Sequence, residues 1–199
     1  MDKEANNSGV EKSTYQQVLS IPTFGYLWFG QVCSQLAANT LLFVLALRVY
    51  RVTSSNTAVS ALFLAYGIPA VLFGMIAGTA VDRLDKRKVL VLCDMVRALF
   101  AISLLFFSHQ VIFVYGITFV NAMITQFYVP SEAPLIPRIV PKPLLVSANS
   151  LFSFTFYSSL AIGSILAGPA LRFFGTRGVF VVIALLFAAA SALSSRIPS

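Results

Sequence analysis

An apolar run stops abruptly at a charged turn in Gly74-Met75-Ile76-Ala77-Gly78-Thr79-Ala80-Val81-Asp82-Arg83-Leu84-Asp85-Lys86-Arg87-Lys88. The turn holds two of the seven acidic residues of the chain and four of its fourteen lysines and arginines. A second apolar run begins directly after it, at Val89. Two long apolar runs that meet at a short, mainly basic turn are typical of membrane-spanning helices joined at one face of a bilayer.

The composition of the whole chain agrees with a membrane location. Of its 199 residues, 58% are hydrophobic and 11% are charged, and the mean hydropathy is +0.85. Soluble domains carry roughly 25% charged residues, so this chain has too little polar surface for water. The net charge of +7 could suggest a nucleic-acid partner. The charges lie mainly in short loops between apolar runs, however, and this pattern favours a lipid bilayer as the partner over nucleic acid.

Charge-free windows of about 20 residues, the length that crosses a hydrocarbon core, predict the spans. Six of them follow a polar N-terminal tail (1–23) and precede a short C-terminal end (196–199). They lie at about 24–47, 57–81, 89–107, 111–129, 147–171 and 179–194. Five prolines between 130 and 143 interrupt the chain after the fourth span, because prolines at that density prevent a continuous helix. The predicted fold class is an all-α integral membrane protein, a bundle of six transmembrane helices.

The distribution of basic residues predicts the orientation of this bundle. If both termini lie on one side, that side holds nine lysines and arginines, including Lys3 and Lys12, and the other side holds four. Cytoplasmic loops carry the excess of basic residues in membrane proteins. We therefore expect both termini and the charged turn to be cytoplasmic.

Two spans carry polar side chains at helical spacing, which places each set on one stripe of its helix. The residues are Gln31, Gln35 and Asn39 in the first span and Thr118, Asn121, Thr125 and Tyr128 in the fourth. Amides are costly in hydrocarbon unless they meet partners or water. The stripes predict a face turned toward an aqueous cavity that carries a substrate. Hydrogen bonding between helices, without a substrate, is the alternative.

Four acidic residues invite separate interpretations. Asp94 and Arg97 are three residues apart and can form an ion pair on one face of the third span. Asp85 is well placed to cap the helix that follows it. Asp82 ends a helix, where the macrodipole is already negative, so it has no local role and requires a cationic partner elsewhere. Glu132 is a candidate proton carrier, although its proline-flanked position favours a solvated acid in a loop.

The sequence predicts neither a metal site nor a disulfide framework. Cys33 and Cys93 lie in apolar runs without a C-x-x-C partner, and His109 is the single histidine. We expect no cofactor.

The charged turn also carries a family resemblance. Gly78-x-x-x-Asp82-Arg83-x-x-Lys86-Arg87, between the second and third spans, resembles the signature loop of the major facilitator superfamily, with Asp85 where the usual pattern has a second glycine. Asp94-x-x-Arg97 resembles a motif of the branch of this family that exports macrolides and enterobactin-type siderophores. So do Leu27-Trp28-Phe29-Gly30-Gln31 and Leu135-Ile136-Pro137-x-x-Val140-Pro141.

The resemblance implies a fold and a mechanism. Members of this family have two six-helix halves, each made of two inverted three-helix repeats, with the substrate site between the halves. Spans one and four would line the cavity, and the loop with Gly78, Asp82, Arg83, Lys86 and Arg87 would gate it by latching one half to the other. The implied activity is secondary active efflux of a small drug-like or siderophore-like molecule across a bacterial cytoplasmic membrane. Gly168-Pro169 matches the antiporter motif only loosely.

Six spans make half of such a transporter, so we expect the chain to be an N-terminal half or a fragment whose partner is a C-terminal six-helix half. A non-transporting membrane remnant or scaffold is the alternative. An intramembrane enzyme is disfavoured, because the chain has no G-x-S-x-G serine and its acidic residues are scattered.

Overall fold

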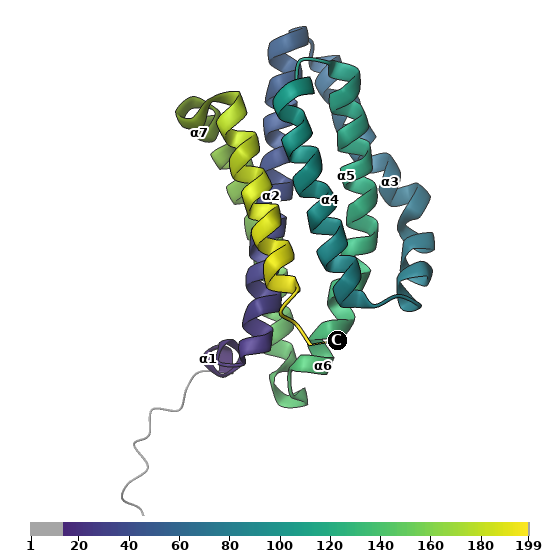
Figure 1. The fold of residues 1–199 in the computed structure, drawn as a ribbon, viewed down its shortest axis with the longest axis vertical. Helices are drawn as coiled ribbons and strands as arrows, with labels where there is room; N and C mark the ends of the chain where they lie inside the picture. Colours follow the sequence, from purple (N-terminus) through teal and green to yellow (C-terminus); the bar gives the residue numbers. More distant parts are fainter. Residues whose placement is uncertain (1–13, 199) are drawn as a thin grey trace, which may run out of the picture.

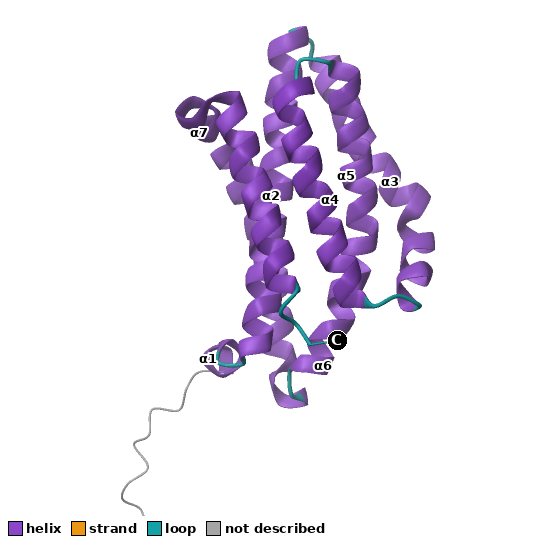
Figure 2. Cartoon of the chain, in the orientation of Figure 1, coloured by secondary structure: helices purple, strands orange, loops and turns teal. Residues whose placement is uncertain are grey.

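The computed structural model describes residues 14–198, which form a bundle of helices (Figure 1). No strand occurs in this part of the chain (Figure 2). The elements are α1 (Thr14–Leu19), α2 (Pro22–Thr53), α3 (Asn56–Asp82), α4 (Lys86–Phe107), α5 (Val111–Glu132), η1 (Ala133–Leu135), α6 (Ile136–Ile139), η2 (Lys142–Leu144) and α7 (Leu145–Ser194). Most of the predicted tail (1–13, with Lys3 and Lys12) and Ser199 lie outside the described residues.

Two of the long helices, α3 and α4, begin after a short polar residue whose side chain caps the helix. The side chain of Ser55 accepts a hydrogen bond from the backbone N–H of Ala58 at the start of α3. The carboxylate of Asp85 accepts one from Lys88 at 3.3 Å at the start of α4, which confirms the capping role predicted for Asp85.

Residues 14–198 hold five helices of membrane-crossing length and apolar composition, where the sequence predicts six. The difference arises in α7, which spans the ranges of both the fifth and the sixth predicted spans. At Gly175 the backbone leaves the helical region, with φ 67° and ψ 175°, and the chain turns back on itself (Figure 1). A positive φ is accessible to glycine at little cost, so this residue divides α7 into two arms.

The proline-rich segment begins later than predicted. Helix α5 continues through Pro130 and ends at Glu132, and the irregular part that follows consists of η1, α6 and η2. A membrane-spanning helix tolerates an internal proline when its neighbours satisfy the freed backbone groups. The prediction that Glu132 is a solvated loop acid is therefore wrong, because Glu132 is a buried helical residue with 5% exposure.

Helix α2 and the first arm of α7 are joined by polar contacts along their length. Trp28 Nε1 donates to Thr155 Oγ1 at 2.9 Å, and Asn39 Nδ2 donates to Ser159 Oγ at 3.0 Å. Gly163 lies next to the backbone of α2, where an added Cβ would be 2.8 Å from Asn39 Cβ and 2.9 Å from Thr40 N. These contacts define a close seam between α2 and α7, made by Trp28, Asn39, Thr155, Ser159 and Gly163.

The two ends of the described chain lie at the same end of the bundle (Figure 1). The turn between α3 and α4 and the short helix α6 are also there, while the α2–α3 and α4–α5 turns lie at the opposite end. The charged turn thus shares one end of the molecule with both termini of the described part.

Candidate substrate cavity and charge network

A cavity of about 330 Å³ lies between α2, α3 and α5, with Arg97 of α4 and Phe156 of α7 also in its wall. Four of the residues predicted for a substrate path line this cavity. They are Gln35 and Asn39 of α2 and Asn121 and Thr125 of α5. The stripes of the two helices therefore meet around one space.

Two residues predicted for the path lie elsewhere. Gln31 is 3% exposed, and its amide donates to the carbonyl oxygen of Phe152 in α7 at 3.5 Å. Tyr128 is 1% exposed, with its ring centroid 5.0 Å from the guanidinium carbon of Arg97. Neither residue lines the cavity. Each polar stripe is thus divided between a part that faces the cavity and a part that contacts another helix, so both interpretations of the stripes apply.

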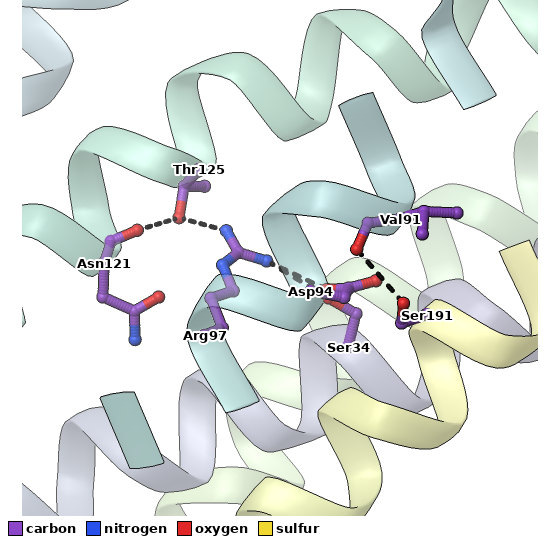
Figure 3. A network of polar contacts seen from close by, with 7 residues as sticks. All are labelled: Ser34, Val91, Asp94, Arg97, Asn121, Thr125 and Ser191. Carbon is purple, nitrogen blue, oxygen red and sulfur yellow. Dashed lines mark hydrogen bonds and ion pairs between the residues drawn. The ribbon is translucent and has the colours of Figure 1, made fainter. Parts of the chain in front are cut away.

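At one wall of the cavity, two buried charged residues of α4 form hydrogen bonds with hydroxyl groups of α2 and α5 (Figure 3). Asp94 and Arg97 of α4 form the predicted ion pair, with 3.6 Å between Arg97 Nη1 and Asp94 Oδ1. Ser34 of α2 donates to Asp94 Oδ1 at 2.6 Å and accepts from Arg97 Nη1 at 3.2 Å. Arg97 Nη2 donates to Thr125 Oγ1 of α5 at 2.8 Å. The hydroxyl of Thr125 donates in turn to the backbone carbonyl of Asn121 at 3.0 Å.

Aromatic rings complete the surroundings of Arg97. Besides Tyr128, the ring of Phe187 in the second arm of α7 lies with its centroid 5.7 Å from the guanidinium carbon. Cation–π contacts of this kind stabilise a guanidinium that has little water around it. Arg97 of α4 thus contacts three other long helices, α2 through Ser34, α5 through Thr125 and Tyr128, and α7 through Phe187.

Several buried polar atoms have no hydrogen-bond partner in the described part of the chain. They are Gln31 Oε1, Asp94 Oδ2, Arg97 Nε, Asn121 Oδ1 and Glu132 Oε1. Buried polar groups in folded proteins are normally satisfied by protein or water. Asp94 forms an ion pair with Arg97, and Arg97 and Asn121 line the same cavity, so this region has unused hydrogen-bonding capacity.

Glu132 adds a second buried carboxylate to this region. It lies close enough to Asp94 and Arg97 to interact with both electrostatically. Two carboxylates therefore share the single guanidinium of Arg97, and the group would carry a net negative charge if all three were ionised. Binding of one proton makes the group neutral.

The structure also shows cavity residues that the sequence interpretation missed. Tyr66 of α3 and Gln126 of α5 line the cavity, and Ser34 joins the charge network. Ser34 lies three residues after Gln31, so helical spacing from the polar stripe could have found it. Tyr66 and Gln126 have no such signal, because each stands outside the two periodic stripes.

The residues predicted for the gating loop lie at the end of the bundle where the described termini meet. Asp82, Arg83, Lys86 and Arg87 border a second cavity of about 420 Å³ together with Arg138 of α6. Lys86 Nζ donates to the carbonyls of Val81 and Asp82 at 3.3 and 3.2 Å, and the Arg87 guanidinium donates to the Ser195 carbonyl. These cations satisfy carbonyls at the ends of α3 and α7. Gly78 lies one turn earlier in α3, and a Cβ atom added to it would have no packing neighbour within 4 Å.

Asp82 itself is exposed, and within residues 14–198 its carboxylate forms neither an ion pair nor a hydrogen bond. Lys86 and Arg87 bind backbone carbonyls instead, and Lys88 forms an ion pair with Asp85. The carboxylate is consequently available to a partner outside the described residues.

Comparisons with known proteins agree with this architecture. The family model of the Major Facilitator Superfamily matches residues 27–197. The uncharacterized MFS-type transporter YkuC of Bacillus subtilis is 29% identical over 143 residues, which cover 70% of this chain and 33% of that protein. Macrolide efflux protein A of Streptococcus pyogenes is 25% identical over 151 residues, which cover 72% of this chain and 37% of the relative.

The chain spans about a third of the length of the curated relatives it matches. The family match nevertheless covers nearly all of the described helices, from α2 to the end of α7. With its bundle of apolar helices and its cavity between α2 and α5, the chain belongs to the Major Facilitator Superfamily.

Proposed function

We propose that this chain forms the substrate cavity of a secondary active transporter that exports a small amphipathic molecule by alternating access. The observation that carries the proposal is the polar cavity on α2 and α5, inside a bundle whose helices are long enough to cross a membrane. Amides and hydroxyls are costly at membrane depth and commonly mark a substrate pathway there. The similarity to macrolide efflux protein A supports export over other directions of transport.

The shape and chemistry of the cavity fit an amphipathic ligand. Its polar residues are accompanied by apolar side chains of Leu41, Leu42, Leu45 and Val129. Ligand sites usually enclose about 300–1,000 Å³, so 330 Å³ is at the lower limit. A cavity of this size suits a substrate that also contacts a second set of helices.

That second set is the proposed partner, a C-terminal six-helix half supplied by the rest of a longer chain or by a separate one. The exposed and unpaired carboxylate of Asp82 supports this partner, because it requires a cation or a helix N-terminus that the described residues do not provide. In this proposal the loop from Gly78 to Arg87 latches the two halves in one conformation and releases them in the other. Asp82→Asn should then reduce transport without reducing membrane insertion, and unchanged flux would remove Asp82 from the mechanism.

We further propose that Glu132 carries the proton that drives export, which would make the transporter an antiporter. Its burial supports this role, as does its position beside Asp94 and Arg97. A carboxylate in such a place can bind and release a proton with a large effect on the local charge balance.

The proposed location is a bacterial cytoplasmic membrane with both termini in the cytoplasm. The basic turn and the two described chain ends share one end of the bundle, in agreement with the excess of basic residues in cytoplasmic loops (Figure 1). Labelling of single cysteines placed at Arg83 and at Arg51 with an impermeant reagent in intact cells tests this orientation. The cysteine at Arg51 should react and the one at Arg83 should not, and the reverse pattern would invert the assignment.

Reconstitution in lipid vesicles tests transport directly. The chain is inserted alone and together with a separately expressed second half, and flux of a fluorescent dye is followed in each case. Flux that requires both halves supports the proposal. The alternative, a non-transporting membrane remnant or scaffold, predicts normal insertion with no flux in either case, and this result would refute transport by this polypeptide.

A further inference from the structure

The charge in the wall of the substrate cavity comes from one residue. Of the side chains of the described residues that line it, Arg97 is the one that is charged, and the others are amides, hydroxyls and apolar groups. The two buried acids nearby, Asp94 and Glu132, do not line the cavity. A ligand in this space therefore meets one positively charged side chain and no carboxylate among the described lining residues.

The guanidinium of Arg97 has hydrogen-bonding capacity left over. Nη2 donates to Thr125, and Nη1 donates to Ser34. Nε has no partner, although the side chain is only 2% exposed. Asn121 Oδ1, also in the cavity wall, is a buried acceptor without a partner. A donor that carries charge and a neutral acceptor are thus available on the same wall.

Arg97 is also incompletely neutralised by Asp94. The 3.6 Å between Arg97 Nη1 and Asp94 Oδ1 exceeds the 2.7–2.9 Å, approximately, of a charge-assisted hydrogen bond. The hydroxyl of Ser34 stands between the two, since it donates to the carboxylate and accepts from the guanidinium. Asp94 Oδ2 remains without a partner. The direct contact between the two charges is therefore weaker than a charge-assisted hydrogen bond, and a carboxylate of the ligand can compete with Asp94 for the guanidinium.

We propose that the substrate of this cavity is an organic anion, an aromatic or aliphatic molecule with a carboxylate that binds Arg97, and that the cavity prefers it to an organic cation of the same shape. The inference rests on the proposed transport function and specifies its substrate class. A guanidinium binds carboxylates through paired N–H donors, and in a site of low dielectric constant it repels a cation strongly. The apolar residues of the cavity hold the hydrophobic body of the substrate, and Asn121 accepts a hydrogen bond from a hydroxyl group on it.

A consequence of this arrangement is that Asp94 competes with the substrate for Arg97. Removing the charge of Asp94 should strengthen anion binding, whereas removing both charges should abolish the preference for anions. A purely structural ion pair would give neither effect, because its loss would change folding and leave the charge preference of the cavity unaltered.

Three probes with the same ring system and different charges test the inference. They are 2-naphthoate, 2-naphthamide and 2-naphthylmethylammonium, and their binding to the full chain in nanodiscs of zwitterionic lipid is measured by equilibrium dialysis against empty nanodiscs. One charge-assisted contact corresponds to roughly a ten- to hundred-fold difference in affinity. We expect 2-naphthoate to bind more tightly than 2-naphthylmethylammonium by that factor, with 2-naphthamide between them.

Three variants make the test specific. Asp94→Asn should bind 2-naphthoate more tightly than the unchanged chain. The double variant Asp94→Asn/Arg97→Gln removes both charges of the ion pair and keeps hydrogen-bonding groups at the two positions, and it should lose the preference for 2-naphthoate. Arg51→Gln removes an exposed cation at the opposite end of the bundle from the charged turn, and it should leave the order of affinities unchanged.

The results that would overturn the inference are equal binding of the three probes, no binding of any of them, or a preference for 2-naphthoate that persists in the double variant. The comparison of probes on the unchanged chain requires no variant to fold. Failure of the proposed function is a separate result. Binding in the expected order with no flux in reconstituted vesicles would refute transport and leave the ligand class intact.

Discussion

Substitution of Gly163 by alanine should separate α2 from α7 and disturb the substrate cavity. The Cβ atom would be 2.8 Å from Asn39 Cβ and 2.9 Å from Thr40 N. Ordinary contacts of a Cβ atom begin near 3.4 Å, so α2 and α7 must move apart by roughly 0.6 Å at this point. The atoms that the new methyl group meets are Asn39 Cβ and two backbone atoms of α2, and none of them can turn aside as the end of a flexible side chain can.

The magnitude follows from two opposing effects. Overpacking in a close-packed interior costs about 1–3 kcal/mol. Alanine is a better helix former than glycine, and this difference offsets up to about 1 kcal/mol of that cost. The net expectation for Gly163→Ala is a loss of about 1–2 kcal/mol in the free energy of unfolding. Because Asn39 lines the cavity and contacts Ser159 across the same seam, ligand binding should weaken as well.

Gly168→Ala is the matched control, since it makes the same substitution in the same arm of α7. A Cβ atom added at Gly168 would have no packing neighbour within 4 Å. This variant should be as stable as the unchanged chain or slightly more stable. The free energies of unfolding are compared by denaturant titration in mixed micelles, followed by the fluorescence of Trp28, which itself contacts α7 through Thr155. Equal stability of the two variants would show that the close approach at Gly163 does not hold α2 and α7 together.

Three further substitutions test single residues. Asp85→Ala removes the N-terminal cap of α4 and should destabilise the bundle by about 1 kcal/mol in the same titration. Lys88→Ala, which removes only the exposed partner of Asp85 in an ion pair of 3.9 Å, should change stability much less, and equal effects would contradict the capping role. Glu132→Gln should abolish the response of flux to an imposed pH gradient if this residue carries the proton. Flux measured with and without the gradient checks this, and a retained response would assign proton coupling to another group.

The features that the sequence predicted are those with a local cause. The helices and the capping role of Asp85 follow from apolar length and from the chemistry of a short acidic side chain before a helix. The ion pair of Asp94 and Arg97 follows from a spacing of three residues in one helix. In each case the interacting groups are neighbours along the chain, so no knowledge of the tertiary structure was needed.

Burial of Glu132 could not be read from the sequence, because it depends on what packs around the end of α5. Pro130 and Pro134 flank this residue and favour a loop, and the bundle overrides that preference by extending α5 through the first proline. Gln31 and Tyr128 show the same limit. Helical spacing places a residue on a stripe, but the depth at which a neighbouring helix covers the stripe decides whether the residue meets a cavity or another side chain.

The charge network joins the binding of a ligand to the packing of helices. Arg97 contacts Ser34 of α2, Thr125 of α5 and the ring of Phe187 in α7, so one guanidinium connects every long helix that surrounds α4 except α3. A carboxylate bound to Arg97 would compete with the contacts to α2 and α5 at the same time. A ligand can shift a conformational equilibrium only by as much as its affinities for the two states differ, and contacts exchanged in this way are a source of that difference. If the substrate is an organic anion, the residue that recognises it is therefore also the residue that could loosen α2 from α5 when the cavity is filled.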